Sequence, residues 1–233
     1  MRIAVLSDVH SNLPALEKIL SHIKSIHADR IYCTGDIVGY GPFPNECIEL
    51  IKDHCHGVVL GNHDAGLIGK AELKAFNKPG RKALEWTMKE IKEKNLTYLS
   101  GLPLIIEEGD ITFVHSSPSN PDKWNYITSI DDAREAFQVF STSFCFIGHT
   151  HIPSVISEDL SLHKVVRGKR FLINTGSVGQ PRDGNPGAAF GFFDTEKWHY
   201  ELKRIEYDVN VMINAIENSG LPQLLSRRLM NGV

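Results

Sequence analysis

Short apolar runs alternate with longer stretches of helical periodicity through the first two-thirds of the chain. The run Ile3-Ala4-Val5-Leu6 is too short for a helix and predicts a buried strand. Beyond it, Pro14 suits the first turn of a helix, and apolar residues recur with helical spacing from Leu16 to Ile23. The same alternation predicts strands over residues 31–33, 57–60, 111–114 and 144–147, and helices over residues 44–53, 80–94 and 130–140.

The last third has a different pattern, because strand-like runs follow one another with Gly and Pro between them. These runs occupy residues 164–166, 170–174, 188–194 and 198–205. Asp208 can then cap a helix that runs to Asn218 and is stopped by Gly220 and Pro222. The sequence shows neither a repeat nor a linker, so residues 1–233 are expected to form a single domain, with C-terminal helices from about residue 208.

A strand–helix alternation followed by a mainly stranded part suggests two packed sheets with helices outside them. We therefore expect an α/β (α+β) fold, arranged as a four-layer α/β/β/α sandwich with two packed mixed β-sheets. Polar clusters come directly after the strand-like runs, and ligands bind at the carboxyl ends of strands in open α/β sheets. The clusters are Asp8-Val9-His10, Gly35-Asp36, Gly61-Asn62-His63-Asp64, His115 and Gly148-His149-Thr150-His151.

Composition narrows the class of protein. The chain has 11 histidines in 233 residues, and histidine is the commonest metal ligand. A formal net charge of −3 gives no reason to expect binding to bulk nucleic acid or to an anionic membrane. No apolar run is long enough for a membrane span, and the N-terminus lacks the features of a signal peptide. The four cysteines are scattered without a CxxC pair and fit reduced thiols, so we expect a cytoplasmic protein.

The polar clusters offer imidazole, carboxylate and one amide as donors, and no thiolate. Such a mixed nitrogen and oxygen set suits Mn, Fe, Zn or related ions rather than a cysteine-based structural zinc site. The potential ligands are too many for one ion, so two ions are expected if one carboxylate bridges them. Two ions roughly 3.5–4 Å apart can activate a water between them for attack on a phosphate ester.

In order, the clusters match DxH, GDxx, GNH[DE], a lone His and GHxH, and the chain resembles the calcineurin-like metallophosphoesterases over roughly residues 1 to 200. Residues 35–42 and 176–182 are similar to a bacterial and archaeal branch described as predicted phosphodiesterases of the YfcE-like kind. The resemblance implies a dinuclear metal-dependent phosphoesterase that hydrolyses phosphate mono- or diesters through a hydroxide that bridges two divalent ions. The ligand set leaves Mn, Fe, Zn, Ni and Co open as the native metal.

The resemblance also implies a role for each matching residue. The first ion takes Asp8, His10 and His151, the second takes Asn62, His115 and His149, and Asp36 bridges both. His63 stabilises the developing charge or protonates the leaving oxygen, and Asp64 orients His63. Residues two apart on an extended strand point alike, so His149 and His151 can reach different ions only if the chain turns after Gly148.

Further residues are candidates for substrate contact. Arg182 is the strongest, because its guanidinium presents a planar fork of donors to phosphate. Asn12 and Tyr40 are weaker candidates at the rim. Residues 64–80 and 116–128 are expected to build that rim, with Asn120-Pro121-Asp122-Lys123-Trp124 as a candidate lid.

Several plainer interpretations stand beside these. Asp64 can be a helix N-cap, and Arg182 can be an ordinary surface arginine. Tyr40 can be a packing residue. The basic stretch 164–170 can be a solvated hairpin rather than a patch that steers anions. No metal site is expected at His54-Cys55-His56, where strand alternation would separate Cys55 from both histidines. His22, His27, His163 and His199 show no partner pattern.

The motifs leave the substrate open. A protein phosphatase, a dinucleoside polyphosphate hydrolase or a nuclease can use the same centre, and a non-catalytic scaffold can share the fold. We expect a small phosphorylated substrate, with nucleotides among the candidates, and neither a membrane nor a nucleic acid as partner. The sequence does not fix the oligomeric state.

Overall fold

The computed structural model describes residues 1–161 and 164–233. Its first sheet has the strand order β10-β9-β1-β2-β3. β1, β2 and β3 run parallel, whereas β9 pairs antiparallel with both β1 and β10. The strands are β1 (Arg2–Leu6), β2 (Arg30–Cys33), β3 (Gly57–Val58), β9 (Ala188–Asp194) and β10 (His199–Ile205).

The second sheet has the order β4-β5-β6-β8-β7. Its three inner strands are parallel, and an antiparallel strand lies at each edge. These strands are β4 (Ile105–Glu108), β5 (Ile111–Val114), β6 (Phe144–Ile147), β7 (Ser154–Ser157) and β8 (Phe171–Asn174). Both sheets are therefore mixed, as the sequence predicts.

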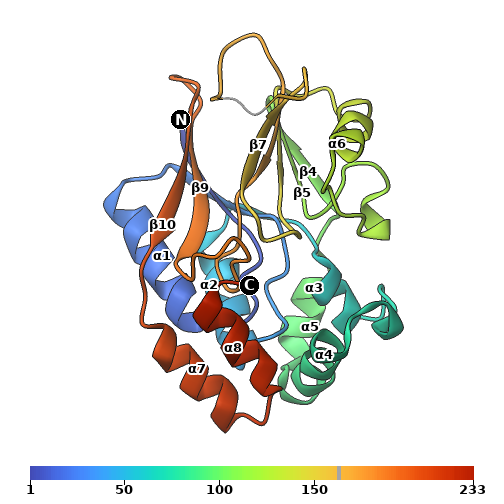
Figure 1. The fold of residues 1–233 in the computed structure, drawn as a ribbon, viewed down its shortest axis with the longest axis vertical. Helices are drawn as coiled ribbons and strands as arrows, with labels where there is room; N and C mark the ends of the chain where they lie inside the picture. The colour runs from blue at the N-terminus through green and yellow to red at the C-terminus, as the bar shows by residue number, and fades with distance from the viewer. Residues whose placement is uncertain (162–163) are drawn as a thin grey trace.

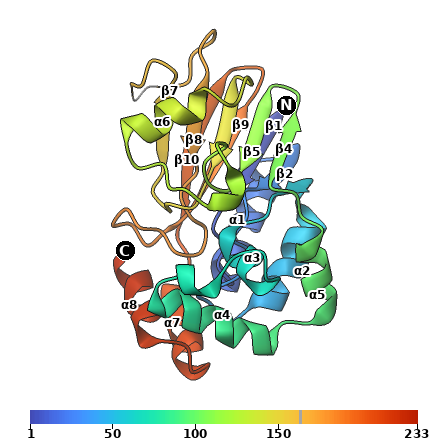
Figure 2. The same ribbon diagram turned by 90° about the vertical axis from the view of Figure 1, so that its right-hand side faces the viewer.

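The two sheets pack face to face (Figure 1), and in the view turned by 90° the second sheet lies in front of the first (Figure 2). An aromatic core lies between them. Ile3 and Val5 of β1 point into this core, whereas Ala4 and Leu6 face the helices on the other side, as strand alternation requires. Tyr32 of the first sheet stacks on Phe113 of the second with ring centroids 4.2 Å apart. Burial on both faces explains why β1 is apolar throughout.

Helices cover the outer face of each sheet. Apolar residues of α1 (Leu13–Ser25) and α2 (Pro44–His54) join the core behind the first sheet, and those of α6 (Ile130–Phe137) join the core behind the second. The structure therefore confirms the sandwich of two mixed sheets between helices. The remaining helices gather at one end of it (Figure 1): α3 (Asn62–Leu67), α4 (Lys78–Glu90), α5 (Glu93–Ser100), α7 (Val209–Asn218) and α8 (Gln223–Asn231). Short 3-10 turns span Leu73–Ala75 and Pro121–Lys123.

The structure corrects several predicted boundaries. The helix expected over residues 80–94 is interrupted, because Ile91 and Lys92 adopt extended backbone between α4 and α5. The strand expected over 57–60 covers only Gly57–Val58. Residues 164–166 form no strand, and Val165 instead packs beside the core between the sheets. Two edge strands, β4 and β7, lie outside the predicted set.

Two general findings complete the fold. Within residues 1–161 and 164–233, no helix is both long and apolar enough to cross a lipid bilayer. All four cysteines are free thiols, and Cys33, Cys47 and Cys145 are buried.

Candidate metal centre

The predicted polar clusters meet at the carboxyl ends of the parallel strands of both sheets. Asp8 and His10 follow β1, and Asp36 follows β2. His115 follows β5, and His149 and His151 follow β6, while Asn62 begins α3 just after β3. Because the two sheets are packed face to face, residues from both reach one place.

The first set of donors consists of Asp8, His10 and His151, all of them buried. His151 Nε2 lies 3.3 Å from Asp8 Oδ1 and 3.2 Å from His10 Nε2. His10 Nε2 lies 3.9 Å from Asp8 Oδ1. One carboxylate oxygen and two imidazole nitrogens therefore converge on a point between them.

The second set lies beside the first and contains Asn62, His115 and His149. His115 Nε2 is 3.1 Å from Asn62 Oδ1 and 3.2 Å from His149 Nδ1. His149 thus turns its Nδ1 toward the centre, whereas His10, His115 and His151 present Nε2.

Asp36 joins the two sets. Its Oδ2 lies 3.6 Å from His10 Nε2 in the first set and 3.4 Å from His115 Nε2 in the second. Its Oδ1 accepts a hydrogen bond of 2.8 Å from the backbone N–H of His63, which fixes the carboxylate in this orientation.

The outward nitrogen of each of these histidines is held by a backbone carbonyl. In the first set, His10 Nδ1 lies 2.9 Å from the carbonyl oxygen of Val38, and His151 Nδ1 lies 2.6 Å from that of Gln180. In the second set, His115 Nδ1 lies 2.8 Å from the carbonyl oxygen of Thr34, and His149 Nε2 lies 2.9 Å from that of Trp124. A carbonyl only accepts hydrogen bonds, so a neutral imidazole carries its proton on this outward nitrogen. The inward nitrogen then bears a lone pair.

This pattern fits metal ions. Two inward nitrogens lie 3.2 Å apart in the first set, and two more lie 3.2 Å apart in the second. Lone pairs at that distance repel unless a proton or a cation lies between them. Carbonyl bonds on the outward nitrogens are also the usual support of metal-binding histidines. The donor set is therefore suited to divalent ions that accept nitrogen and oxygen.

Tight turns place these side chains. Asp8, His10, Asp36, His149 and His151 all adopt left-handed backbone, with φ between 49° and 68°. Such strain is typical of functional sites. The predicted turn after Gly148 is present, and it directs His149 and His151 into different donor sets.

Glycine is required beside two of these turns. A Cβ on Gly148 would lie 1.8 Å from Ser7 Oγ and 2.6 Å from Asp8 Oδ2. A Cβ on Gly61 would lie 2.1 Å from Asp36 Oδ1. The glycines of the two motifs therefore allow the backbone to approach the carboxylates closely.

His63 lies against the first donor set. Its ring centroid is 4.8 Å from that of His10, 4.6 Å from that of Tyr40 and 4.9 Å from that of Phe76. Its Nδ1 is buried against Gly39 and has no hydrogen-bond partner among the described residues. Nε2 is therefore the nitrogen left to meet a substrate.

Asp64 does not hold His63 through a hydrogen bond, contrary to what the resemblance implies. Its Oδ1 accepts from the backbone N–H of Val38 and its Oδ2 from that of Gly61, each at 3.1 Å. The N-cap interpretation also fails, because α3 begins at Asn62 and Asp64 lies inside its first turn. Asp64 instead ties the start of α3 to the turn after β2.

Of the predicted substrate contacts, two lie at the centre and one does not. Arg182 Nη2 donates to Tyr40 Oη at 3.3 Å and to Gln180 Oε1 at 3.2 Å, and Tyr40 packs on the His10 ring with centroids 4.5 Å apart. Asn12 does not line the centre, contrary to the prediction that it contacts the substrate. Its amide is fully buried, caps α1 at the N–H of Ala15, and donates to the Gly179 carbonyl and the Tyr207 hydroxyl.

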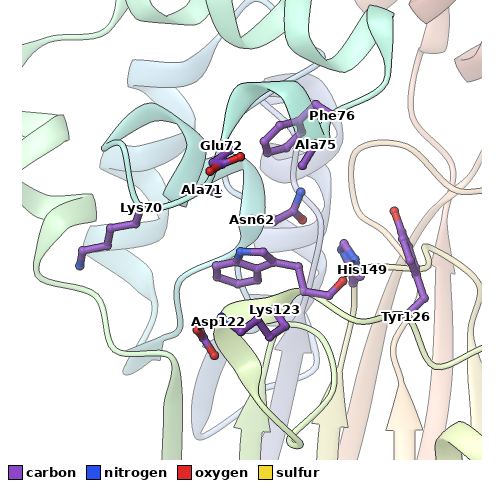
Figure 3. Close-up of a pocket in the computed structure, with 11 residues that line it drawn as sticks. Asn62, Lys70, Ala71, Glu72, Ala75, Phe76, Asp122, Lys123, Tyr126 and His149 are labelled. Atoms are coloured by element: carbon purple, nitrogen blue, oxygen red, sulfur yellow. Dashed lines mark hydrogen bonds and ion pairs between the residues drawn. The ribbon is translucent and has the colours of Figure 1, made fainter.

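A cavity of about 440 Å³ opens beside the second donor set (Figure 3). Asn62 and His149 line its inner side, and both predicted rim segments, 64–80 and 116–128, contribute to its walls. Tyr126 stacks on the His149 ring with centroids 3.9 Å apart, although 51% of the residue is exposed. Sequence reasoning did not single out Tyr126 or Phe76. The only signal for Tyr126 is an aromatic residue two positions after Trp124 in a polar loop.

The profile of the calcineurin-like phosphoesterase superfamily domain matches residues 1–197. The chain belongs to this superfamily. The phosphoesterase is 46% identical to an uncharacterized protein of Methanocaldococcus jannaschii, over 99% of this chain and 98% of that protein. It is 41% identical to the metallophosphoesterase from Sphaerobacter thermophilus, whose crystal structure matches with a TM-score of 0.90 over 100% of this chain and 99% of that chain. A symmetrical bis(5'-nucleosyl)-tetraphosphatase of Methylococcus capsulatus is 28% identical over 80% of this chain and 72% of that enzyme.

The family confirms a hydrolase that acts on phosphate esters, and it implies divalent metal ions. The structure supplies His and Asp groups able to hold them.

The electrostatics of the phosphoesterase differ between the two donor sets. Burial alone would lower the pKa of His115, but the Asp36 carboxylate outweighs it and raises the pKa to about 9. Burial likewise opposes ionisation of Asp36, yet His115 above all holds the pKa of that carboxyl well below its usual range. In the first set, burial lowers the pKa of both His10 and His151 below their usual range.

Burial also governs the groups beside the ligands. It raises the pKa of Asp8 to about 6 and that of Asp64 to about 7, and it lowers the pKa of His63 to about 4. His63 is therefore a neutral imidazole at pH 7.

Other polar residues of the phosphoesterase have structural partners. His54 Nδ1 bonds the Leu50 carbonyl at the end of α2, and His56 Nδ1 accepts from the backbone N–H of Ile31. In the basic stretch, Lys169 pairs with Asp159 and Arg170 with Glu158. His163 lies outside the described residues.

Proposed function

We propose that the protein is a dinuclear metal-dependent phosphoesterase acting on phosphate mono- or diesters. Its proposed ligands are Asp8, His10 and His151 for one ion, Asn62, His115 and His149 for the other, and Asp36 for both. The observation that carries the proposal is the position of Asp36 Oδ2, which lies 3.6 Å from His10 Nε2 and 3.4 Å from His115 Nε2. One carboxylate oxygen therefore serves both donor sets.

A pair of divalent ions in such a centre lowers the pKa of a water and offsets negative charge on the phosphate oxygens. The residues of the chain supply the rest. The carbonyls of Val38, Thr34, Gln180 and Trp124 keep the imidazole lone pairs directed inward. Since this outer support fixes both tautomer and ring orientation, the ligands need little rearrangement when ions enter.

His63 and Arg182 are proposed to act on the substrate. His63 is neutral at pH 7, because burial lowers its pKa to about 4. Its imidazole N–H can therefore donate a hydrogen bond to the leaving oxygen as negative charge develops there. Arg182 presents its guanidinium beside Tyr40 and binds a phosphate oxygen, with the phenol hydroxyl holding it in place.

The proposal is tested by hydrolysis of an aryl phosphodiester and an aryl phosphomonoester, with each of Mn²⁺, Fe²⁺, Zn²⁺, Ni²⁺ and Co²⁺ added to metal-free protein. Turnover that depends on the added ion, with Mn²⁺ among the active metals, is expected. A folded protein that hydrolyses neither ester with any of the five ions would contradict an enzymatic role. A folded protein that also binds no divalent ion would indicate a scaffold of this fold.

A dinucleoside polyphosphate hydrolase is the second candidate function. It is favoured by the similarity to the bis(5'-nucleosyl)-tetraphosphatase of Methylococcus capsulatus and by the aromatic side chains of Phe76, Trp124 and Tyr126 around the cavity. Aromatic rings of this kind can stack on a nucleobase. Diadenosine tetraphosphate, a cyclic nucleotide and a phosphopeptide, assayed in parallel, would separate this candidate from a phosphodiesterase and from a protein phosphatase.

A further inference from the structure

The loop between β8 and β9 is tied to the first donor set through its backbone. The carbonyl oxygen of Gln180 lies 2.6 Å from His151 Nδ1, and the backbone N–H of Arg182 donates to the His151 carbonyl at 3.2 Å. Earlier in the loop, Ser177 Oγ donates to the Asp8 carbonyl and accepts from the backbone N–H of Gln180, each at 2.8 Å. The loop therefore holds Gln180 in place beside two proposed ligands of the first ion.

The side chain of Gln180 makes a separate contact, with Arg182. Only 1% of Gln180 is exposed, and its Oε1 accepts a hydrogen bond from Arg182 Nη2 at 3.2 Å. The same nitrogen donates to Tyr40 Oη at 3.3 Å, and the guanidinium carbon lies 5.9 Å from the centroid of the Tyr40 ring. Tyr40 in turn packs on the His10 ring with centroids 4.5 Å apart. One buried amide and one phenol therefore hold the guanidinium beside the first donor set.

These contacts engage only one nitrogen of the guanidinium. Nη2 has two N–H groups, and the two acceptors can take both of them. Neither Nη1 nor the buried Nε of Arg182 has a hydrogen-bond partner among the described residues. The two N–H groups of Nη1 therefore remain for a ligand. Hydrogen bonds between a guanidinium and a phosphate oxygen are charge-assisted and are among the strong ones.

Both acceptors are neutral, so they do not offset the charge of Arg182. Within residues 1–161 and 164–233, no carboxylate forms an ion pair with this guanidinium. Asp183, the carboxylate next in sequence, pairs with Arg204 instead. A carboxylate at position 180 would reach the same Nη2, form a salt bridge and compete with a phosphate for the cation. An amide at this position orients the guanidinium without competing for it.

We propose that Gln180 is a positioning residue, which holds Arg182 through a neutral contact and so leaves its charge and its Nη1 donors for the phosphate of the substrate. This proposal rests on the function proposed above, in which Arg182 binds a phosphate oxygen. Because the backbone carbonyl of Gln180 also directs His151, one residue aligns the phosphate-binding cation with the ligands of the first ion.

The test measures the dissociation constant of inorganic phosphate, which the enzyme cannot hydrolyse, by calorimetry at a fixed free Mn²⁺ concentration. Gln180→Met keeps the backbone carbonyl and the length of the side chain but removes the acceptor, so it should weaken phosphate binding about threefold. Gln180→Glu keeps an acceptor but offsets the cation, so it should weaken phosphate binding about tenfold or more. With an aryl phosphate, both variants should raise KM by about the same factors and leave kcat nearly unchanged.

Two controls accompany these variants. Arg182→Met supplies the background for a double-mutant cycle, in which Gln180→Met should cause no further loss of phosphate affinity, because the contact that it removes is already gone. Gln138→Glu places the same charge at an exposed residue after α6 and should leave the dissociation constant as in the wild type. The Mn²⁺ content of every variant should equal that of the wild type.

The outcomes separate this inference from the proposed function. A merely structural role of Gln180 would make its Met and Glu variants alike, lower their Mn²⁺ content, and weaken phosphate binding equally with and without Arg182, which would overturn the proposal. Gln180→Glu that binds phosphate as tightly as the wild type would also overturn it and leave the phosphoesterase assignment intact. A wild type that binds neither Mn²⁺ nor phosphate would overturn both.

Discussion

The two donor sets of this centre are supported in different ways. Asp8, His10 and His151 lie on tight turns at strand ends and are buried, with 2% exposure or less. The second set depends on the loop 116–128, because the Trp124 carbonyl holds His149 Nε2 and the exposed Tyr126 covers its ring. One half of the centre is therefore built into the sandwich, and the other half is completed by a surface loop.

The halves also differ in protonation. His10 and His151 have pKa values below their usual range, so both are neutral at pH 7. The pKa of His115 is raised to about 9 by Asp36, so in the absence of an ion it carries a proton. In the metal-free protein, therefore, a proton on His115 lies where a metal ion would bind in the second donor set, and the first set has no such proton on its histidines. Asp36 is the one side chain common to both sets, and changing it gives the largest expected effect.

Asp36→Asn should impair metal binding by both donor sets and abolish turnover. The neutral amide cannot supply the charged oxygen that lies within 3.6 Å of His10 Nε2 and within 3.4 Å of His115 Nε2. We expect turnover of an aryl phosphate to fall on the order of 10³-fold or more, and the metal content to fall with it. The exposed Asp53→Asn is the matched control. Normal turnover in Asp36→Asn would contradict the assignment of Asp36 as a ligand of both ions.

His63→Ala should separate chemistry from metal binding. His63 contacts His10 and Tyr40 but belongs to neither proposed ligand set. We expect kcat to fall about 10²-fold while the metal content stays as in the wild type. The exposed His27→Ala serves as control, and metal analysis accompanies the kinetics. Loss of an ion in His63→Ala would mean that His63 is a ligand instead.

Above pH 7 the affinity for the second ion should rise with pH, whereas that for the first should stay nearly constant, because Asp8, with a pKa of about 6, is already ionised there. Below pH about 9 the metal-free His115 is protonated, and an ion can bind its Nε2 only after that proton leaves. The affinity should therefore rise about tenfold per pH unit from neutral pH toward the pKa of His115 and level off above it. Competition with a metal-ion indicator at several pH values measures this. Two affinities with the same pH dependence would contradict the difference between the halves.

Tyr126→Ala should weaken only the half that the loop completes. Loss of a ring stacked at 3.9 Å on His149 should reduce the affinity of one ion about threefold to tenfold. Tyr126→Phe keeps the ring and is the matched control. Equal weakening of both ions in Tyr126→Ala would show that the loop supports the whole centre.

Much of the fold follows from the sequence. The apolar runs that became β1, β2, β5 and β6 are buried on both faces, so hydrophobicity alone marks them. The polar clusters lie where these strands end, so their order along the chain already predicts a shared edge. The edge strand β4 lies outside the predicted set for a physical reason. β4 is Ile-Ile-Glu-Glu with two exposed positions, and its pairing with β5 rather than its own pattern makes it a strand.

The site was predictable only as far as the motifs reach. The residues that meet at the centre came from the motifs, but the partners of Asp64 and Asn12 depend on which backbone groups the fold brings near. Asp64 satisfies the N–H groups of Val38 and Gly61, and Asn12 caps α1 and bonds Gly179. Tyr126 belongs to no motif, and only tertiary packing brings it to the site.

The proposed bridge is tested most directly by titrating metal-free wild-type protein with Mn²⁺ and recording electron paramagnetic resonance. Asp36 Oδ2 lies within 3.6 Å of a histidine nitrogen in each donor set, so two ions per chain should share this oxygen and give a spin-coupled signal. Saturation at one Mn²⁺ per chain, or two ions with independent signals, would contradict a centre bridged by Asp36.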